Sequence, residues 1–414
     1  MPDFQSALAA SSNIAASCAS GSPLQFILKV ASRCNLNCSY CYVYNKGDNT
    51  WQSRPSIMPA AVFTAAVGRI RRSCQSSGQT VAQIVFHGGE PCLAGAARLK
   101  AWCREMRDGL RGVADPHFAI QTNGTLIDEE WIAVFREEGI RIGVSMDGPA
   151  AIHDAFRVDH RGRGSHAAVE EGLRALLDAG LSPEVLSVIP LNGDGLRTYE
   201  YFRSLGIRRI NFLLPDYTHD TKRSAVADPR ATPVADFLMP IVEKWCRQDW
   251  EETEIPLFRQ IAELVLGGPS RWDQFGNGPM GIVCVEADGA IEGLDVLRVC
   301  GDGMAAAGLS VLCDDFERIA AASELHGRAI FEGISVPSDC TGCPERDTCG
   351  GGYLPHRFSK ERGFDNPSIW CADILQLFGK MRELLSVSVA ETASRQAFLR
   401  LKQLSNREGD ASSP

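Results

Sequence analysis

The chain has 414 residues, of which 44% are hydrophobic and 22% are charged, a composition typical of a globular protein with one large domain and a smaller one. Its 42 basic and 51 acidic residues give a net charge of −9, which disfavours nucleic acid as a partner. No apolar run reaches the roughly 18 to 20 residues that span a bilayer, so we expect no membrane segment.

Fifteen cysteines in a chain without a signal-peptide pattern predict a cytoplasmic protein that uses thiols for metal ligation rather than for disulfides. The first residues, 1–23, are rich in Ala and Ser and predict a disordered lead-in.

From residue 24 to about 230, short apolar runs alternate with stretches of helical period. The predicted strands are 26–31, 82–87, 117–121, 140–145, 184–189 and 208–214. The predicted helices are 59–76, 94–110, 128–138, 166–179 and 195–205. Six strands alternating with helices predict a parallel sheet with right-handed crossovers, which is a partial (β/α)6 barrel of the TIM type. The active site of such a barrel lies at the carboxyl ends of the strands.

Three thiols follow the first predicted strand in a loop, with three residues and then two residues between them: Cys34, Cys38 and Cys41. Three thiolates can hold three irons of a [4Fe–4S] cluster and leave the fourth iron free for a small molecule. Zinc is the alternative, although structural zinc takes four nitrogen or sulfur ligands. The spacing favours the iron–sulfur cluster.

Polar residues and glycines also follow the other strands. They are Gly88, Gly89 and Glu90 after the second strand, Asn123 after the third, Ser145 after the fourth, and the segment 216–220 after the sixth. Each has an ordinary alternative, because Gly-Gly, Asn123-Gly124 and Asp147-Gly148 are also common turn sequences. Their shared position after strands predicts a site rather than scattered turns.

Beyond the barrel, residues 231–275 predict a helical connector whose aromatic residues, Trp245, Trp250, Phe258 and Trp272, belong to the core. A second group of cysteines occupies the region 276–380, and 381–414 predicts a C-terminal helix, running to about residue 404, and a tail. Four of these cysteines, Cys340, Cys343, Cys349 and Cys371, supply enough thiols for a complete cluster or for zinc.

The Cys34–Cys41 motif with Tyr40, followed by the Gly88-Gly89-Glu90 motif, resembles the radical S-adenosylmethionine (SAM) enzymes. The resemblance implies that the free iron binds the amine and carboxylate of SAM, and that Tyr40 packs near adenine. It implies that Gly88, Gly89 and Glu90 receive the methionyl ammonium. It also implies that Asn123, Ser145 and Arg157 contact the ribose and the methionyl carboxylate.

The region 276–380 resembles a SPASM domain, which carries auxiliary iron–sulfur clusters in many peptide-modifying radical enzymes. The resemblance implies one auxiliary [4Fe–4S] cluster at Cys340, Cys343, Cys349 and Cys371. The family pattern has a further cysteine at position 353, where this chain has Tyr353. That cysteine serves a second auxiliary cluster with upstream ligands, for which this chain offers Cys284 and Cys300, with Cys313 poorly placed. Whether one or two auxiliary clusters are present therefore stays open.

The run from Cys349 to Cys371 resembles the FxsB-type maturases, which act on ribosomally made precursor peptides. Members of this and related subgroups join an aromatic ring to the β-carbon of a nearby residue, which gives a cyclophane. The resemblance implies cleavage of SAM by an electron from a flavodoxin or ferredoxin, and abstraction of a β-hydrogen from the peptide. His356 and Arg357 either line the substrate site or belong to a packed loop over the cluster.

The reaction also needs a base within hydrogen-bonding reach of the proton that leaves the aromatic ring. The candidates are Asp295 and Asp302, which flank Cys300, and Asp288 near Cys284. Each could instead be a surface or turn aspartate, and Asp288-Gly289 in particular has the pattern of a turn.

Other outcomes of the same chemistry remain open. A SPASM maturase could form a thioether, epimerise a residue, or oxidise a Cys or Ser as in sulfatase maturation. A zinc-binding or electron-transfer protein without radical chemistry is the alternative from a different class. It would not cleave SAM, and the zinc form would be colourless.

Overall fold

The computed structural model describes residues 24–222, 225–270 and 273–397. Six parallel strands follow one another along one sheet: β1 (Gln25–Ala31), β2 (Val81–Gly88), β3 (Asp115–Thr122), β4 (Arg141–Ser145), β5 (Glu184–Val188) and β6 (Arg209–Leu213). The helices between them are α2 (Ala60–Ser77), α3 (Ala96–Leu110), α4 (Glu129–Glu137), α5 (Ala150–His153), α6 (His166–Asp178) and α7 (Gly195–Ser204). Each predicted strand is present with its ends shifted by no more than two residues.

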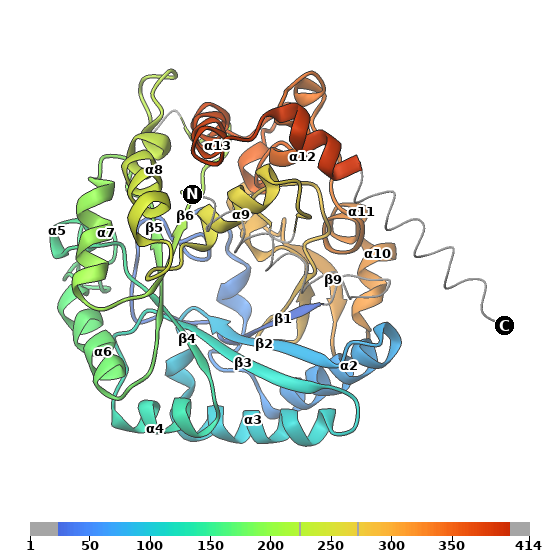
Figure 1. Ribbon diagram of the computed structural model, residues 1–414. Helices are drawn as coiled ribbons and strands as arrows, with labels where there is room; N and C mark the ends of the chain where they lie inside the picture. The colour runs from blue at the N-terminus through green and yellow to red at the C-terminus, as the bar shows by residue number, and fades with distance from the viewer. Residues whose placement is uncertain (1–23, 223–224, 271–272, 398–414) are drawn as a thin grey trace.

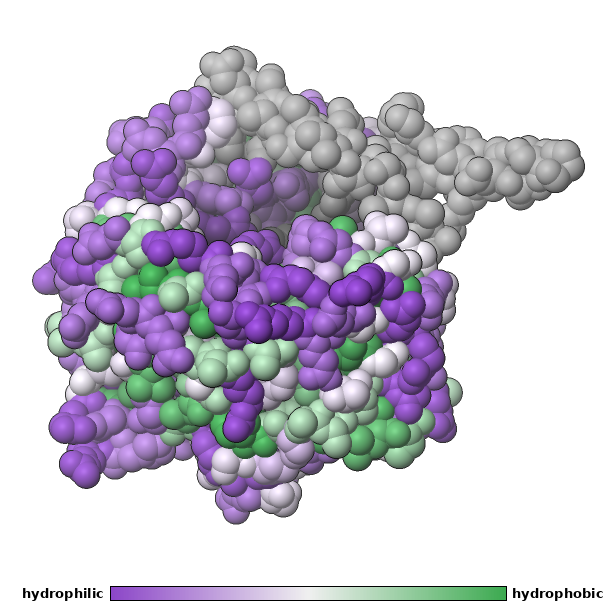
Figure 2. All heavy atoms as spheres, turned by 90° about the horizontal axis from the view of Figure 1, so that it is seen from below, coloured by the Kyte–Doolittle hydropathy of each residue, from purple (hydrophilic) through white to green (hydrophobic). Residues whose placement is uncertain are grey.

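The helices cover the outer face of the curved sheet, as Figure 1 shows for α3 and α4 below the strands. Their sequences explain this, because in α3 the buried residues Leu99, Trp102 and Met106 recur at helical spacing, while Arg104 and Arg107 on the opposite face are exposed. Strand β2 alternates buried and half-buried residues along its length. The outer face of the molecule, seen from below, accordingly carries hydrophilic side chains with smaller hydrophobic areas between them (Figure 2).

The sheet continues beyond the barrel into the C-terminal region. Strands β7 (Ile282–Val285), β8 (Ala290–Glu292) and β9 (Ala306–Ser310) extend it in the order β6-β5-β4-β3-β2-β1-β7-β8-β9. Strand β7 runs parallel to β1, with Gln25 opposite Ile282, and β8 and β9 are antiparallel additions. The domain boundary predicted near residue 276 therefore does not separate two sheets, because β7, which follows it, is hydrogen bonded to β1 of the barrel.

The connector region is helical, as predicted. It contains α8 (Pro233–Lys244), the π-helical turn η4 (Trp245–Asp249) and α9 (Pro256–Val265). Trp245 and Phe258 are buried with their rings 5.6 Å apart, and Trp250 packs against the same core, which confirms that these aromatics are core residues. Trp272 lies outside the described residues.

Short helical elements make up most of the remaining C-terminal region. They are η5 (Asp295–Cys300), η6 (Phe316–Arg318), α10 (Ile319–Ala322), α11 (Glu324–Gly327), η7 (Arg328–Glu332), η8 (Ser338–Cys340), α12 (Arg346–Cys349), η9 (Leu354–Arg357) and the longer α13 (Cys371–Leu385). Two further turns, η1 (Thr50–Ser53) and η2 (Pro91–Ala94), follow β1 and β2. None of the described helices is long and apolar enough to cross a membrane.

The predicted C-terminal helix needs a correction. Helix α13 ends at Leu385 because Ser386 adopts a left-handed conformation with φ of 53°, and a second helical stretch covers 389–397. The rest of the predicted helix and tail, and the predicted lead-in 1–23, lie outside the described residues.

Candidate active site

The three thiols of the first motif lie together in the loop that follows β1. The loop is held by backbone hydrogen bonds from Asn37 to Val158, at 2.7 Å, and from Cys41 to Cys38, at 3.0 Å. The pKa of Cys34 is raised to about 12 and that of Cys38 to about 11. Burial is the main cause of both rises, and the neighbouring thiols contribute a smaller part. Thiols that raise one another's pKa become stable thiolates only when a metal replaces their protons, so this loop fits a metal cluster.

The Gly88-Gly89-Glu90 segment at the end of β2 lies directly against the start of the cysteine loop. The Gly89 amide donates to the Ala31 carbonyl at 2.7 Å, and the Glu90 amide donates to the Arg33 carbonyl at 2.9 Å. A Cβ on Gly88 would lie 2.2 Å from the Ala31 oxygen, and a Cβ on Gly89 would lie 2.4 Å from the Arg33 oxygen. Both glycines are therefore required by close backbone approach, beyond what a simple turn needs.

The Glu90 carboxylate is fully buried and is largely satisfied within the chain. It accepts hydrogen bonds from the Cys92 amide at 2.9 Å, the Thr122 hydroxyl at 2.7 Å and the Asn123 amide at 2.6 Å. Glu90 thus ties the ends of β2 and β3 together. The role of Glu90 in binding a ligand ammonium stays a prediction.

A buried group of three side chains lies beside the cysteine loop. Asp147, at the end of β4, accepts hydrogen bonds from the Tyr40 hydroxyl and from Arg157 Nε, the latter at 2.9 Å. The Arg157 guanidinium also lies 5.3 Å from the centre of the Tyr40 ring, and it lowers the pKa of the Cys38 thiol against the larger effect of burial. The structure therefore brings Arg157 to Tyr40 in the cysteine loop, whereas the predicted contacts of both residues with SAM stay predictions.

The sequence interpretation missed Asp147, because Asp147-Gly148 was explained as a turn. The side chain of Asp147 is 1% exposed, and it also accepts a hydrogen bond from the Val188 amide at 3.0 Å, so it links β4 to β5 at the site. Its position directly after a predicted strand was the available signal.

Asn123 and Ser145 both lie at carboxyl ends of strands. The Asn123 side-chain amide donates to Asn35 at 2.8 Å and lies 3.7 Å from the Cys34 sulfur. Ser145 accepts a hydrogen bond from Gln121 at 2.9 Å. Asn123 is thus part of the cysteine loop's surroundings, whereas the predicted contacts of both residues with ribose and carboxylate stay predictions.

Asp295, one of the three candidate bases, is held by Lys29 on β1 and by Tyr42 in the cysteine loop. Lys29 forms an ion pair with Asp295, and the Tyr42 hydroxyl donates to Asp295 at 2.6 Å. Burial acts to raise the pKa of Asp295, but the nearby Lys29 ammonium and these hydrogen bonds outweigh burial and lower it. His87, whose pKa is lowered to about 4 by burial and by Lys29, completes this neighbourhood.

The other two candidate bases have ordinary structural partners. Asp288 accepts a hydrogen bond from the Ala290 amide at 3.0 Å in the turn between β7 and β8, and it is 3.5 Å from Arg54. Asp302 accepts from the Asn49 amide at 2.8 Å in an exposed position. The turn interpretation of Asp288 therefore holds, and among the three aspartates only Asp295 has a buried partner of opposite charge next to the cysteine loop.

A second enclosed pocket is lined by the four predicted ligands of the auxiliary cluster, Cys340, Cys343, Cys349 and Cys371. Burial raises the pKa values of Cys340, Cys349 and Cys371, and the neighbouring thiols contribute a smaller part of each rise. Four thiols from η8, α12, α13 and the loop between them therefore converge on one small cavity. Their number and arrangement fit a complete cluster ligand set.

Cys284 and Cys300 do not line this pocket. Cys284 is buried on β7 opposite Ile27, and Cys300 packs in a separate apolar cluster with its sulfur 4.0 Å from the Pro355 carbonyl oxygen. Cys313 is exposed. The role of Cys284 and Cys300 as ligands of a further cluster stays a prediction.

The described ranges contain no group of three or more His, Cys, Asp or Glu side chains arranged to hold a single metal ion. The thiolates of a [4Fe–4S] cluster bind different irons and need not converge on one point.

His356 and Arg357 prove to be packed residues rather than residues of an open groove. The His356 ring is fully buried, lies 5.1 Å from the Tyr353 ring, and has Nε2 3.3 Å from an oxygen of Asp216. Arg357 is also buried, and it influences the pKa values of the Cys340 and Cys349 region rather than facing solvent. The loop interpretation therefore describes both residues.

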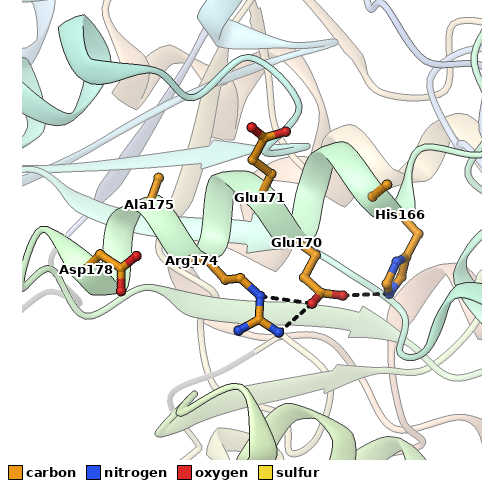
Figure 3. Close-up of a pocket in the computed structure, with 7 residues that line it drawn as sticks. His166, Glu170, Glu171, Arg174, Ala175 and Asp178 are labelled. Atoms are coloured by element: carbon orange, nitrogen blue, oxygen red, sulfur yellow. Dashed lines mark hydrogen bonds and ion pairs between the residues drawn. The ribbon is translucent and has the colours of Figure 1, made fainter.

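A further hollow on the molecule lies on the outer face of α6, far from the chemistry of the cysteine loop. As Figure 3 shows, its side chains project from one helix, and Glu170 pairs with both Arg174 and His166. Pairs of charged side chains four residues apart are typical of the solvent-facing side of a helix, so we interpret these side chains as a helix surface rather than as a catalytic site.

Comparison with known proteins supports this geometry. Residues 28–215 match the Radical SAM superfamily model. The chain is 25% identical over 411 residues to the serine-type anaerobic sulfatase-maturating enzyme of Bacteroides thetaiotaomicron, covering 91% of this chain and 93% of that protein. It is also 25% identical over 374 residues to the cysteine-type enzyme of Clostridium perfringens, covering 86% of this chain and 95% of that protein.

Solved structures share the fold. Native anSMEcpe with bound AdoMet matches with a TM-score of 0.73 and 23% identity, over 93% of this chain and 100% of that chain. Streptococcus suis SuiB bound to the precursor peptide SuiA matches with a TM-score of 0.57 and 16% identity, over 89% of this chain and 79% of that chain. The predicted barrel with a C-terminal domain is thereby confirmed.

Proposed function

We propose that this chain is a radical SAM enzyme, which uses SAM and a [4Fe–4S] cluster, and that it matures a ribosomally made peptide by oxidising it. The match of residues 28–215 to the Radical SAM superfamily model supports this proposal. The observation that carries the proposal is the joining of the two motifs: the Gly88–Glu90 segment is hydrogen bonded to the chain that enters the Cys34–Cys41 loop. Two sulfatase-maturating relatives aligned over most of the chain support the assignment as a maturase.

In this proposal Cys34, Cys38 and Cys41 hold the first cluster, and the four-cysteine pocket holds an auxiliary cluster. When bound, the first cluster with SAM supplies a hydrogen-abstracting radical, and the auxiliary cluster supplies a one-electron acceptor. The chain's own residues prepare this reaction by orienting ligands. Tyr40 is fixed by Asp147, Asp147 is fixed by Arg157, and Glu90 and Asn123 hold the strand ends beside the thiols.

Asp295 accepts the proton that leaves the substrate. It is ionised at neutral pH because Lys29 and Tyr42 keep its pKa low against burial, and it lies beside a residue of the cysteine loop. The overall reaction removes one hydrogen atom, one proton and one electron from the peptide, so the peptide loses two hydrogens. Geometry rather than basicity favours Asp295 over Asp288 and Asp302.

The product we favour is a carbon–carbon crosslink between an aromatic ring and the β-carbon of a nearby residue. It is supported by the likeness of the Cys349–Cys371 run to the cyclophane-forming maturases. The second candidate is oxidation of a Ser or Cys side chain, which the two sulfatase-maturating relatives favour. The peptide-bound SuiB structure is a fold relative that carries a precursor peptide, which fits a peptide as the substrate class.

The test is anaerobic reconstitution with iron and sulfide, followed by incubation with SAM, dithionite and two sets of peptides. One set is encoded next to the enzyme's own reading frame, and the other consists of sulfatase-type peptides with a central Ser or Cys. We would measure 5′-deoxyadenosine and peptide mass. The crosslink is indicated when the peptide loses two hydrogens, does not react with a hydrazide, and gives no backbone fragment ions from the segment between the two joined residues. Reaction with the hydrazide indicates an aldehyde and the second candidate.

A control separates the radical chemistry from the substrate. Cys38→Ala should abolish 5′-deoxyadenosine formation. Protein that holds about eight irons per chain, enough for both clusters, but forms no 5′-deoxyadenosine would refute the proposed function.

A further inference from the structure

Arg357 is a buried cation next to the four-cysteine pocket. It is 4% exposed and ends η9, and its Nη1 lies 3.7 Å from the position of a Cβ on Gly351, a residue that lines the pocket. Its side chain interacts electrostatically with the Cys340 and Cys349 thiols. The guanidinium is therefore close to the place that a cluster held by these cysteines would occupy.

The charge of Arg357 is not neutralised by an acid. Its Nε donates to the Phe364 carbonyl at 3.1 Å and its Nη2 to the Ser335 carbonyl at 2.8 Å, and both acceptors are neutral. In the part of the chain that the structure describes, no Asp or Glu forms an ion pair with it. The acid that acts on it electrostatically, Asp365, is hydrogen bonded to Ser338 at 2.7 and 2.8 Å.

A buried cation without a counter-charge costs several kcal/mol. Burial lowers the pKa of Arg357 to about 10, so the side chain nevertheless stays protonated at neutral pH. A negative charge brought to this site would offset the cost of burying the cation. A cluster held by four thiolates is an anion, and it becomes more negative by one charge when it takes up an electron.

Resting on the auxiliary cluster of the proposed function, we propose that Arg357 is the counter-cation of that cluster and raises its reduction potential. A fixed positive charge stabilises the reduced cluster more than the oxidised cluster, because the reduced cluster carries the additional electron. No bond is made or broken at Arg357. Its function is to make the cluster a better acceptor of the single electron that leaves the peptide.

Arg346 provides a matched control because it lines the same pocket in a different environment. Its side chain is 50% exposed and lies 3.8 Å from the carboxylate of Asp347. Water and a neighbouring acid therefore screen its charge. The same Arg→Gln substitution at the two positions compares a buried, unpaired cation with an exposed, paired one.

The experiment is a redox titration of the full chain in a Cys34→Ala/Cys38→Ala/Cys41→Ala background, which removes the ligands of the first cluster and keeps the four-cysteine pocket. Iron and sulfide are counted first, and the reduced cluster is then followed by electron paramagnetic resonance. Arg357→Gln should lower the ratio of reduced to oxidised cluster at a given potential about tenfold, which corresponds to about 59 mV for one electron. Arg346→Gln and Arg357→Lys should each change that ratio less than threefold.

The outcomes distinguish this inference from the proposed function. A cluster that is present in Arg357→Gln with an unchanged potential overturns the role of Arg357 alone. If Arg357→Gln loses its iron, the Arg357→Lys variant replaces it in the test. An unchanged reduction potential in Arg357→Lys supports the role of the positive charge, and a tenfold change in the ratio of reduced to oxidised cluster overturns that role. Background protein without iron overturns both the auxiliary cluster and the counter-cation. The shift should persist at about 1 M salt, where the Debye length is about 3 Å and exposed charges are screened.

Discussion

The Lys29–Asp295 ion pair offers the sharpest test of how the interior of the site is held. Lys29 is 2% exposed and is bonded to Asp295 and, at 3.3 Å, to the Tyr42 hydroxyl. Lys29→Met keeps most of the side-chain length and removes the charge. Asp295, whose side chain is 16% exposed, is then left with the Tyr42 hydroxyl as its remaining donor among the contacts described above.

Removing one partner of a buried ion pair costs about 3–5 kcal/mol, because the other charge is left uncompensated. Lys29 also opposes the effect of burial on Glu286, whose pKa is already raised to about 7, so a second buried acid loses stabilisation. We therefore expect Lys29→Met to lower the free energy of unfolding by about 4 kcal/mol near pH 8. Lys29→Met combined with Asp295→Asn should cost less than the sum of the two single changes, by about 2–3 kcal/mol.

The pH dependence follows from the direction of the Asp295 pKa. In the wild type this pKa is below that of the unfolded chain, so the pair's contribution is fully present above about pH 4 and is lost as the pH falls through the folded pKa. In Lys29→Met, the largest effect that opposes burial is gone and only His87 and the Tyr42 hydrogen bond still oppose it, so we expect the Asp295 pKa to rise above that of the unfolded chain. The variant then loses stability as the pH rises from the unfolded value towards the raised pKa, and its deficit should be larger at pH 8 than at pH 5.5.

The assay is anaerobic urea unfolding at both pH values, followed by tryptophan fluorescence, with all variants at equal iron content. The reasoning would be refuted by single changes that add within about 0.5 kcal/mol in the double variant, since contacting charges should couple. A deficit that is the same at pH 5.5 and pH 8 would also refute it.

Three further predictions follow from the site. Gly88→Ala places a Cβ 2.2 Å from the backbone oxygen of Ala31, so it should abolish SAM binding in equilibrium dialysis. Gly379→Ala, with nothing within 4 Å of its Cβ and no left-handed backbone, should bind SAM normally. Burial lowers the pKa of His153 to about 4, so the folded protein loses stability as the pH falls below about 6.5, where the unfolded chain takes up a proton and the buried His153 does not. In His153→Gln, the loss of unfolding free energy between pH 7 and pH 5, measured by urea unfolding, should be smaller by about 2 kcal/mol. Cys371→Ala should lower the iron content by about four per chain while SAM cleavage at the first cluster continues.

The sequence predicted the barrel and the gathering of its motifs because both depend on local patterns. Each strand is a short apolar run, and the carboxyl ends of parallel strands meet at one side of a barrel. Cys34, Glu90 and Asn123 could therefore be expected at one site from their positions after strands. The contact of Asn123 with the Cys34 sulfur and the hydrogen bond from its amide to Glu90 agree with that expectation.

Other features depend on contacts that no local pattern contains. Lys29 lies inside a strand with no motif, and its partner Asp295 is more than 260 positions away, so their pairing emerges only from the fold. Asp147 has the sequence of a turn, yet its carboxylate binds Tyr40 and Arg157 because β4 ends beside the cysteine loop. The sequence left Arg357 either at the substrate site or in a packed loop over the cluster, and its burial beside the thiols agrees with the packed loop.

The pairing of β7 with β1 has a consequence for dissecting this protein. Within the described sheet, β1 would be a terminal strand of the barrel if β7 were removed, and its apolar run from Phe26 to Val30 would present unpaired backbone groups to solvent. Exposed, flat, hydrophobic edges of this kind template aggregation. A barrel fragment cut before residue 282 should therefore aggregate even though its own motifs are complete. We therefore expect the C-terminal region to protect the barrel from aggregation by covering the edge of β1, whatever cluster it carries.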